Sequence, residues 1–220
     1  MERSFVIIKP DGTARRRVSA LVVEALLNEG LNIIAFKEMK VPESLAKMHY
    51  DVHKDKPFFP WLVDFISSAP VLTMIFEANN AIQKIRDALG ATFVQKAAPT
   101  SLRGKYGIWA GVNIAHASDA PETAAKEIEL WTIEGGLAVS SDAEEKARSY
   151  IAKYSVGAAD YTMDIRDLVR LSIENRDTSD SALQNLTDLL GKDAEGISTK
   201  EIATLAKVIF DFVIEEVEKA

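Results

Sequence analysis

The sequence contains no cysteine, and this absence excludes disulfide bonds and metal centres built on thiolate ligands. It also lacks a long apolar run. The apolar stretch near its beginning, residues 5–8, has only four residues before Lys9 and Pro10, which is too short for a signal-peptide core. No other segment reaches the length that spans a membrane. We therefore expect a soluble, cytoplasmic protein with no membrane partner.

Several well-known sequence patterns are absent as well. There is no GxxxxGK[ST] loop, no GxGxxG fingerprint and no protein-kinase motif set, which disfavours the enzyme classes that depend on them. Histidine is scarce, with three residues in the chain. His49 and His53 have the spacing of two metal ligands on a helix, but HYDVH lacks the glutamate of the zinc motif HExxH. We predict no metal held by the protein itself.

Positive charge is in short supply in the C-terminal part of the chain. The net charge is −7, and residues 1–135 balance 16 Lys and Arg against 16 Asp and Glu, whereas residues 136–220 hold 10 against 17. An acidic region is poorly suited to gripping nucleic acid, so no nucleic-acid partner is expected. The three arginines at 15–17 leave nucleic-acid binding as a weaker alternative, which a salt titration of affinity would test.

What is present is a globular composition, with 47% hydrophobic and 27% charged residues. Up to residue 135 the patterns predict strands at 4–8, 31–40, 70–77 and 113–116. They predict helices at 18–29, 44–53, 59–68, 79–89 and 122–130. The polar segment 92–107 predicts a long loop, and such loops are usually functional. This order fits an α+β fold, an antiparallel sheet of the split βαβ type with helices on one face.

The pattern changes after Trp131. Residues 133–136, IEGG, indicate a linker. Beyond it, capping residues and helical periodicity predict helices at 140–154, 161–175, 180–190 and from 198 nearly to the end. We therefore predict two domains, one at 1–135 and an acidic, all-α extension at 136–220. We interpret the extension as an accessory or assembly domain, with a regulatory or partner-binding module as the alternative.

His116 is the first candidate for chemistry. It follows a short predicted strand, and Ser118 and Asp119 come next in a polar turn. Glu127, in the following helix, is placed to reach back to the ring. A carboxylate on one imidazole nitrogen fixes the tautomer and leaves the other nitrogen free as a nucleophile. Without this neighbourhood, a single histidine after a strand is more often structural.

Four further residues suggest an anion site, although each signal is weak alone. Lys9 lies where the chain leaves the first predicted strand, and its plain alternative is a solvated turn lysine. Thr92 and Arg103 bracket the long loop, and Arg86 lies in the helix before it. Arginines chelate phosphate oxygens well. Taken alone, both arginines would be ordinary surface residues.

Five segments, ordered along the chain, resemble nucleoside diphosphate kinases. They are FVIIKPDG at 5–12, HYxxHKDKPFF at 49–59, GAT at 90–92, AAPTSLRG at 97–104 and GVNIAHASD at 111–119, the last of which contains the family's signature NxxHxSD. The resemblance covers about residues 3–131. It implies a ferredoxin-like fold and a ping-pong reaction, in which His116 takes the γ-phosphoryl group of a nucleoside triphosphate such as ATP and gives it to a nucleoside diphosphate.

The resemblance also implies a role for each matching residue. The catalytic residues would be His116, Lys9, Tyr50, Asn113, Ser118 and Glu127, with Tyr50 close to the phosphoryl group and Ser118 and Glu127 orienting the histidine. The nucleotide-binding residues would be Lys9, Phe58, Leu62, Arg86, Thr92, Arg103 and Asn113, with Phe58 and Leu62 at the base, Arg86, Thr92 and Arg103 at the phosphates, and Asn113 at the sugar. Phe58, Leu62 and Tyr50 have core packing as their alternative. Mg²⁺ would lie mainly between the phosphates, and a homo-oligomer is expected.

Four sites depart from the family's usual pattern. The family usually has a glycine where this chain has Arg16, a glycine where it has Trp61, an Asn-Pro pair where it has Phe93 and Val94, and an arginine where it has Val112. None of these changes removes a residue with an implied chemical role. The substituted loop at residues 93–94 and the extension support an alternative function, a nucleotide-binding regulatory or scaffold protein with little turnover. Binding of nucleotide without phosphoryl transfer would favour that alternative.

Overall fold

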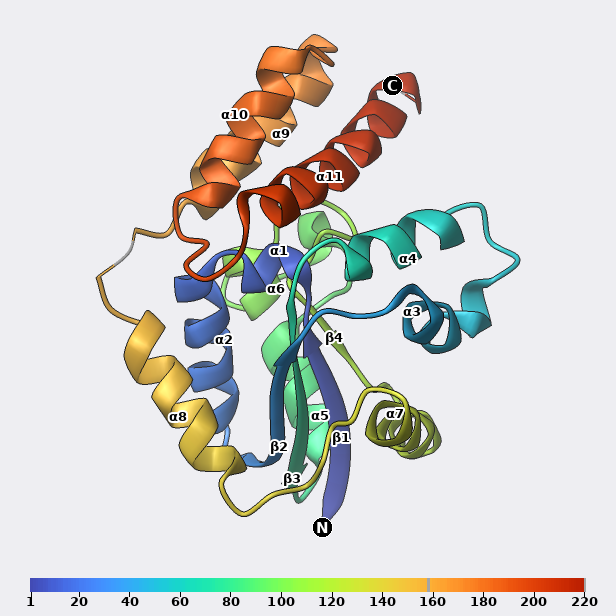
Figure 1. Cartoon of the computed structure of the whole chain (residues 1–220), viewed down its shortest axis with the longest axis vertical. Coiled ribbons are helices and arrows are strands. Elements are labelled where there is room, and N and C mark those ends of the chain that lie inside the picture. The colour runs from blue at the N-terminus through green and yellow to red at the C-terminus, as the bar shows by residue number, and fades with distance from the viewer. Residues whose placement is uncertain (158, 220) are drawn as a thin grey trace.

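The computed structural model describes residues 1–157 and 159–219, so positions 158 and 220 of the predicted extension lie outside the described residues. A four-stranded antiparallel sheet forms its centre, in the order β2-β3-β1-β4. The strands are β1 (Glu2–Ile8), β2 (Asn32–Met39), β3 (Val71–Ala78) and β4 (Ala115–Ala117). This is the α+β, ferredoxin-like arrangement predicted from the sequence (Figure 1).

Helices cover both faces of the sheet, so the prediction of helices on one face is wrong. The helices concerned are α2 (Arg16–Asn28), α5 (Ala81–Leu89), α3 (Glu43–His49) and α7 (Pro121–Ile133). Val6 and Ile8 of β1 share a core with α2 and α5, whereas Phe5 and Ile7 share another with α3 and α7. Alternate residues of a strand point to opposite faces, so an uninterrupted apolar strand such as residues 5–8 is buried on both.

The helix predicted at 44–53 is present as α3 followed by the 3-10 turn η1 (Asp51–His53). Three other short helices were not predicted: α1 (Pro10–Thr13), the 3-10 turn η2 (Val94–Lys96) and α6 (Leu102–Tyr106). Two of them lie inside the expected loop at 92–107, so that segment is more ordered than its composition suggested. Ser101 caps α6, because its Oγ accepts a hydrogen bond from the backbone N–H of Gly104 at 3.2 Å. The predicted helix at 59–68 is present as α4 (Phe59–Ser67).

The C-terminal region is helical, as predicted. It consists of α8 (Ala143–Tyr154), α9 (Thr162–Asn175), α10 (Asp180–Gly191) and α11 (Thr199–Lys219). The helices do not form one body of their own. In Figure 1, α8 lies beside α2 and β2, while α9, α10 and α11 gather at the other end of the sheet, next to α1 and α4.

Helix α8 packs into the same core as the sheet. Ala147, Tyr150 and Ile151 of α8 are buried against apolar residues of α2 and β2. The segment before α8 contacts β2 directly, since the backbone N–H of Ser140 donates to the carbonyl of Ile34 at 2.9 Å. The first helix beyond residue 135 is therefore continuous with the core of the sheet.

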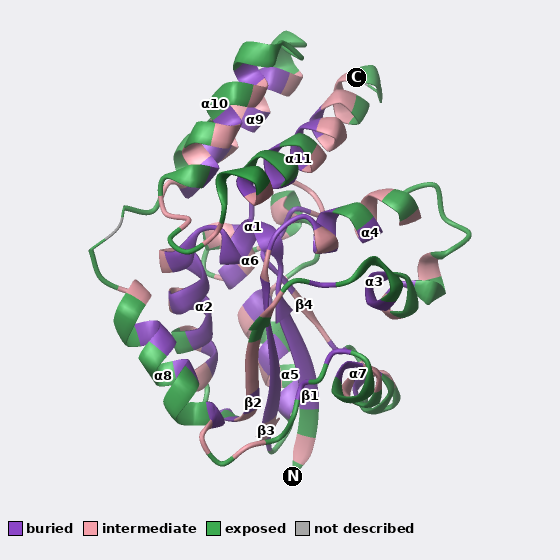
Figure 2. Cartoon of the chain, in the orientation of Figure 1, coloured by how far each residue is buried: buried purple, intermediate pink, exposed green. Residues whose placement is uncertain are grey.

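The other three helices form a second core with α4 and the segment before β4. Leu205, Ile209 and Val213 of α11 are buried in a cluster that also contains Phe65 and Val112. Figure 2 shows that each of these helices has a buried side, which faces the rest of the protein, and an exposed outer side. Within residues 1–157 and 159–219, no helix is long and apolar enough to span a bilayer. The division into domains at 135 remains a prediction.

Candidate active site

The centre of the site is a hydrogen-bonded group of His116, Glu127 and Ser118. His116 lies on β4, opposite Ile7 of β1. Its Nε2 is 2.6 Å from Glu127 Oε1, and the Ser118 hydroxyl donates to Glu127 Oε2 at 2.6 Å. An ionised carboxylate only accepts hydrogen bonds, so the proton of a neutral ring lies on Nε2. The Nδ1 lone pair of His116 is then free, which is the arrangement expected from the sequence.

His49 is a residue of the site that the sequence reasoning did not assign. Its ring meets that of His116 edge-on, with centroids 4.6 Å apart and planes at 87°. The indole N–H of Trp131 donates to His49 Nδ1 at 3.3 Å, which places the proton of His49 on Nε2. Burial, and then the neighbouring His116, lowers the pKa of His49 well below its ordinary value. His49 is therefore a neutral neighbour of the nucleophile.

Three residues of this site form a group of possible metal ligands. His49, His116 and Glu127 offer atoms that all lie within 4.8 Å of one another. His53, which was considered as the partner of His49, instead has its ring 5.7 Å from that of Phe58. The spacing of the two histidines in sequence was therefore a poor guide to which side chains meet.

Tyr50 is buried behind His49, and their ring centroids are 4.7 Å apart. Its hydroxyl has no hydrogen-bond partner among the described residues. Burial raises the pKa of this phenol, and the negative charges of Glu127 and Asp11 raise it further. Tyr50 therefore stays a neutral hydroxyl group that can donate one hydrogen bond.

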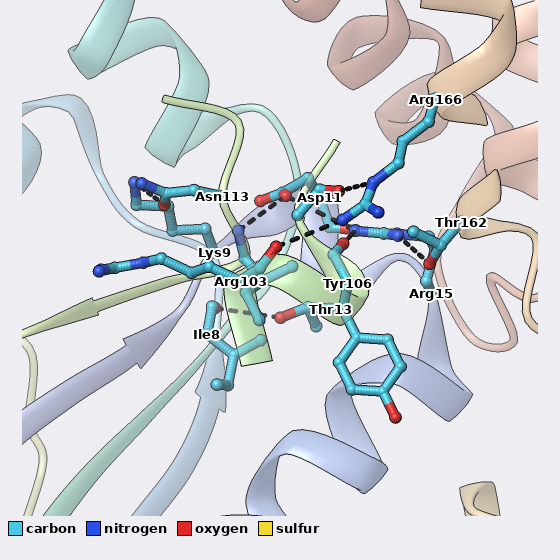
Figure 3. A network of polar contacts seen from close by, with 12 residues as sticks. Ile8, Lys9, Asp11, Thr13, Arg15, Arg103, Tyr106, Asn113, Thr162 and Arg166 are labelled. Atoms are coloured by element: carbon cyan, nitrogen blue, oxygen red, sulfur yellow. Dashed lines mark hydrogen bonds and ion pairs between the residues drawn. The ribbon is translucent and has the colours of Figure 1, made fainter. Parts of the chain in front are cut away.

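Lys9, Asn113 and Thr92 form a chain of contacts beside the histidine. Lys9 Nζ donates to Asn113 Oδ1 at 2.9 Å and to the carbonyl of Gly111 at 3.3 Å (Figure 3). The Asn113 amide donates to the carbonyl of Thr92 at 2.7 Å. Burial lowers the pKa of Lys9 to about 8, and nearby Arg103 adds to this effect while Asp11 opposes it. Three of the predicted residues are thus brought together.

The turn between Asn113 and His116 has an unusual backbone. Ile114 has a φ of +69°, which a β-branched residue rarely adopts. Asp11 holds this turn, since its Oδ2 accepts the N–H of Ile114 at 3.0 Å, and the N–H of Lys9 donates to the Ile114 carbonyl at 2.7 Å. Asp11 was missed because an aspartate in a Pro-Asp-Gly turn is ordinarily exposed, whereas this one is fully buried.

Arg86 and Arg103 supply positive charge near Lys9. Arg103 donates to the carbonyls of Gly90 and Ala115 at 2.8 and 2.9 Å, which fixes its guanidinium. Burial, followed by the like charge of Arg86, lowers the pKa of Arg103 to about 10. Within the described part of the chain, neither arginine forms an ion pair with a carboxylate. Cations held close together without a carboxylate form a site for an anion.

Phe58 and Leu62 line a cavity of about 560 Å³ next to this cationic group. Phe58 precedes α4 and is 48% exposed, so it is not a core residue. Gly111, whose carbonyl accepts from Lys9, also lines the cavity. The site therefore joins three parts: a free imidazole nitrogen, a cluster of cations and an apolar cavity.

Comparison with known proteins identifies the family to which this chain belongs. The sequence profile of the nucleoside diphosphate kinase family matches residues 2–135, more than half of the chain. The chain belongs to the nucleoside diphosphate kinase family. It is therefore a phosphotransferase that binds nucleotides and has nucleoside diphosphate kinase activity, as its motifs predicted. The alternative of a scaffold with little turnover has no support in these matches.

Individual members of the family agree with this assignment. A nucleoside diphosphate kinase of Synechocystis is 46% identical over 131 residues, which cover 60% of this chain and 87% of that protein. One from Methanothermobacter thermautotrophicus is 45% identical over 131 residues, with the same two coverages. The solved structure of the Halobacterium salinarum enzyme in complex with CDP is 40% identical, with a TM-score of 0.58, and the match covers 66% of this chain and 97% of that one.

Three of the four departures from the family's usual residues contact the C-terminal helices. Trp61 donates its indole N–H to the carbonyl of Val208 at 2.9 Å, and Val112 is buried in the core that α11 shares. Arg16 donates to the carbonyl of Glu195 at 2.8 Å and pairs with Glu38 at 2.8 Å. These three residues therefore contact the extension.

The burial of two arginines in the 15–17 cluster bears on the alternative of nucleic-acid binding. Arg15 and Arg16 are only 1% and 2% exposed. Arg15 donates to the hydroxyl of Thr162 at 2.7 Å, and it lies 3.7 Å from Asp11. Two of the three arginines are therefore committed to contacts inside the protein, and they offer no surface to a phosphate backbone.

Helix α9 also supports the segment that carries Arg103. The Arg166 guanidinium donates to the carbonyl of Gly104 at 2.8 Å and to that of Arg103 at 3.3 Å (Figure 3). It donates to the carbonyl of Gly107 as well. Arg166 lies outside the family's motifs, so no sequence signal singled it out. The extension thus stabilises α6 through hydrogen bonds to its backbone carbonyls.

Proposed function

We propose that His116 is the residue that carries the phosphoryl group in a ping-pong reaction. Its Nδ1 attacks the γ-phosphorus of a nucleoside triphosphate, the bond from that phosphorus to the bridging oxygen breaks, and the nucleoside diphosphate leaves. A second diphosphate then attacks the phosphohistidine and regenerates the free ring. The observation that carries the proposal is the 2.6 Å contact of Nε2 with Glu127, which leaves Nδ1 as the nucleophile.

The neighbouring residues have proposed roles that follow from their charges and positions. Lys9, Arg86 and Arg103 would neutralise the phosphate oxygens, and Tyr50 would donate its hydroxyl proton near the transferred group. Ser118 supports the catalytic carboxylate, since its hydroxyl donates to Glu127 at 2.6 Å. Asn113 would bind the sugar hydroxyls, and Thr92 would contact a phosphate.

The base would stack on Phe58 with Leu62 beside it, at the edge of the 560 Å³ cavity. Stacking uses the π-face that every base has, so such a site accepts several nucleotides. The aromatic contacts continue from there toward the nucleophile. The rings of Phe58, His53, Tyr50, His49 and His116 follow one another with centroids 4.6–6.5 Å apart.

Magnesium is proposed as the ion that the nucleotide phosphates carry. The residues fit this role, because the groups facing the phosphates are cations and offer no oxygen cage. The two carboxylates that contact residues of the site already accept hydrogen bonds. Glu127 accepts from His116 and Ser118, and Asp11 accepts from the backbone of Ile114. The ion would neutralise charge on the phosphate oxygens and orient them, while Lys9, Arg86 and Arg103 hold the remaining oxygens.

We also propose that the protein is a homo-oligomer, as the resemblance to the family suggests. Within this chain, the extension already occupies the surfaces of α2, β2 and α4, so another face would have to form the contact between copies. The mass of the protein in solution, measured by light scattering, tests this proposal, and a monomer at micromolar concentration would contradict it.

A labelling experiment tests the catalytic proposal. Incubation with γ-labelled ATP and Mg²⁺ is expected to give a protein-bound label that is stable to base and lost in acid, as a phosphohistidine is. The label should pass to added GDP or UDP, and EDTA should prevent both steps. Transfer without any phosphoprotein would exclude the ping-pong route and favour direct transfer between two bound nucleotides.

Lys9 gives the reaction a predicted pH dependence. Burial lowers its pKa to about 8, and only the protonated lysine attracts phosphate. We expect kcat/KM for the nucleotide to fall as the pH rises through about 8, by up to about tenfold per pH unit, because kcat/KM follows the free enzyme. A pH profile from 6.5 to 9.5 measures this fall.

Two variants serve as controls for the Lys9 prediction. Lys9→Arg keeps its charge throughout this range, so the fall should move above pH 9.5 even if the activity is lower. Lys9→Met has no proton to lose, so its low activity should not follow the wild-type curve. A wild-type profile that stays flat to pH 9.5 would show that Lys9 does not titrate in this way.

A further inference from the structure

The cavity that contains Phe58 and Leu62 has a wall that comes from the C-terminal extension. Phe212, Glu215, Glu216 and Lys219, all in the last part of α11, line the same space. The catalytic and nucleotide-binding motifs end well before this helix begins. A segment outside the family's matched region, residues 2–135, thus borders the place proposed for the base.

Trp61 fixes this wall in position. Its ring stacks on Phe65 with centroids 4.8 Å apart and lies 5.4 Å from the ring of Phe212. Its indole N–H donates to the carbonyl of Val208 at 2.9 Å. Trp61 belongs to α4, the helix that Phe58 precedes. The stacking residue and the α11 wall are therefore held to one another through a single side chain.

The two sides of the cavity differ in chemistry. Phe58, Leu62 and Phe212 present apolar surface, which suits the face of a base. Glu215 and Glu216 present carboxylates, which only accept hydrogen bonds. Lys219 lies 3.6 Å from Glu215 and 3.2 Å from Glu216, so an ammonium group stands beside the two acceptors. The wall thus places hydrogen-bond acceptors and a donor beside the apolar surface of the cavity.

We propose that the end of α11 reads the base edge and makes guanine nucleotides the preferred substrates; this inference rests on the proposed base site at Phe58. Guanine carries two adjacent donors, N1–H and the N2 amino group, that fit one carboxylate, and its O6 accepts from an ammonium group such as Lys219. Adenine places an acceptor, N1, beside its amino group. Uracil flanks its single donor with two carbonyls. In both bases an acceptor would face the carboxylates, and two acceptors cannot form a hydrogen bond with each other.

The test uses the phosphorylated full-length protein. Phosphoenzyme freed of nucleotide is discharged by GDP, ADP, CDP or UDP, and kcat/KM is obtained for each acceptor. We expect GDP to be favoured over ADP and UDP by about five- to tenfold, the low end of what a bidentate contact to a base gives, because the wall is partly exposed. The double variant Glu215→Gln with Glu216→Gln should bring the GDP to ADP ratio close to one.

Glu218→Gln is the matched control. Glu218 is an exposed glutamate on the same turns of α11 and does not line the cavity, so its replacement changes net charge without touching the wall. The ratio in this variant should equal that of the wild type. A double variant that keeps the wild-type ratio, or a control that loses it equally, would overturn the inference.

Calorimetric binding separates this inference from the proposed function. If no phosphoenzyme forms, the proposal about His116 fails, but the affinities of the protein for GDP and ADP can still be measured. A wild-type preference for GDP that Glu215→Gln with Glu216→Gln removes would support the inference about α11. Equal affinities for GDP and ADP in the wild type would refute it, whatever the outcome of labelling.

Discussion

Replacing His116 with alanine is expected to abolish both label uptake from γ-labelled ATP and transfer to GDP. The loss should be at least about ten-thousand-fold, because the variant has no group that can hold the phosphoryl between the two half-reactions. His116 is only partly buried, so its replacement should leave the fold intact. The initial rate of phosphoryl transfer and the amount of labelled protein measure the effect together.

The control is a second histidine variant. His53→Ala removes an imidazole whose ring faces Phe58 at 5.7 Å and lies away from the Glu127 contact. This variant should still take up label, even if its affinity for nucleotide changes. Label on the His116→Ala protein, in an amount near that of the wild type, would mean that another residue carries the phosphoryl group. Equal melting temperatures for all three proteins would rule out unfolding as the cause.

Ending the chain after residue 135 is expected to leave a protein without a stable fold. The deletion removes Tyr150 and Ile151 from the core of the sheet, at roughly 2 kcal/mol for each large buried side chain. It also removes the hydroxyls of Thr162 and Tyr150, to which Arg15 and Arg16 donate, and a hydrogen bond to a charged group contributes about 1.5–3 kcal/mol. Together these losses approach the whole stability of an ordinary domain, about 5–15 kcal/mol.

Thermal unfolding followed by circular dichroism measures the effect. The full chain should unfold cooperatively, whereas residues 1–135 should show a broad transition or precipitate. A chain ending after residue 157 keeps α8, so it should recover part of the lost stability. If residues 1–135 alone unfold as sharply and at the same temperature as the full chain, the division into two independent domains predicted from the sequence is correct.

The sequence predicted most of the fold because its elements are strongly patterned. Continuous apolar residues predicted β1 and β3. The periodicity and capping residues of the C-terminal region predicted the bounds of its helices to within a few residues. The errors have local causes. α1 and α6 are four and five residues long, too short for periodicity to reveal. The uninterrupted apolar residues 5–8 do indicate burial on both faces of the sheet. Which helices cover which face depends on tertiary packing, which no local pattern contains.

The candidate site was predicted in a similarly uneven way. His116, Lys9 and Asn113 lie in ordered motifs, and the structure brings them close to one another with Glu127. Their proposed roles await the experiments above. Asp11 and His49 lie in the same motifs, and His49 was weighed as a metal ligand, but neither was given its role in the site. That role comes from burial and from contacts with residues more than 60 positions away. The parts played by Arg166 and α11 follow only from tertiary packing.

The contact of Ser140 with Ile34 has a consequence for how copies of this protein meet. Unpaired backbone groups on an outer strand invite a strand of another molecule, and this can continue into open-ended aggregation. Here residue 140 and α8 cover the side of β2, and at the opposite side of the sheet β4 has only three residues. Among residues 1–157 and 159–219, neither side of the sheet offers a long free strand. We therefore expect copies to meet through side-chain surfaces, which can close on themselves, and not through a sheet that grows from one molecule to the next.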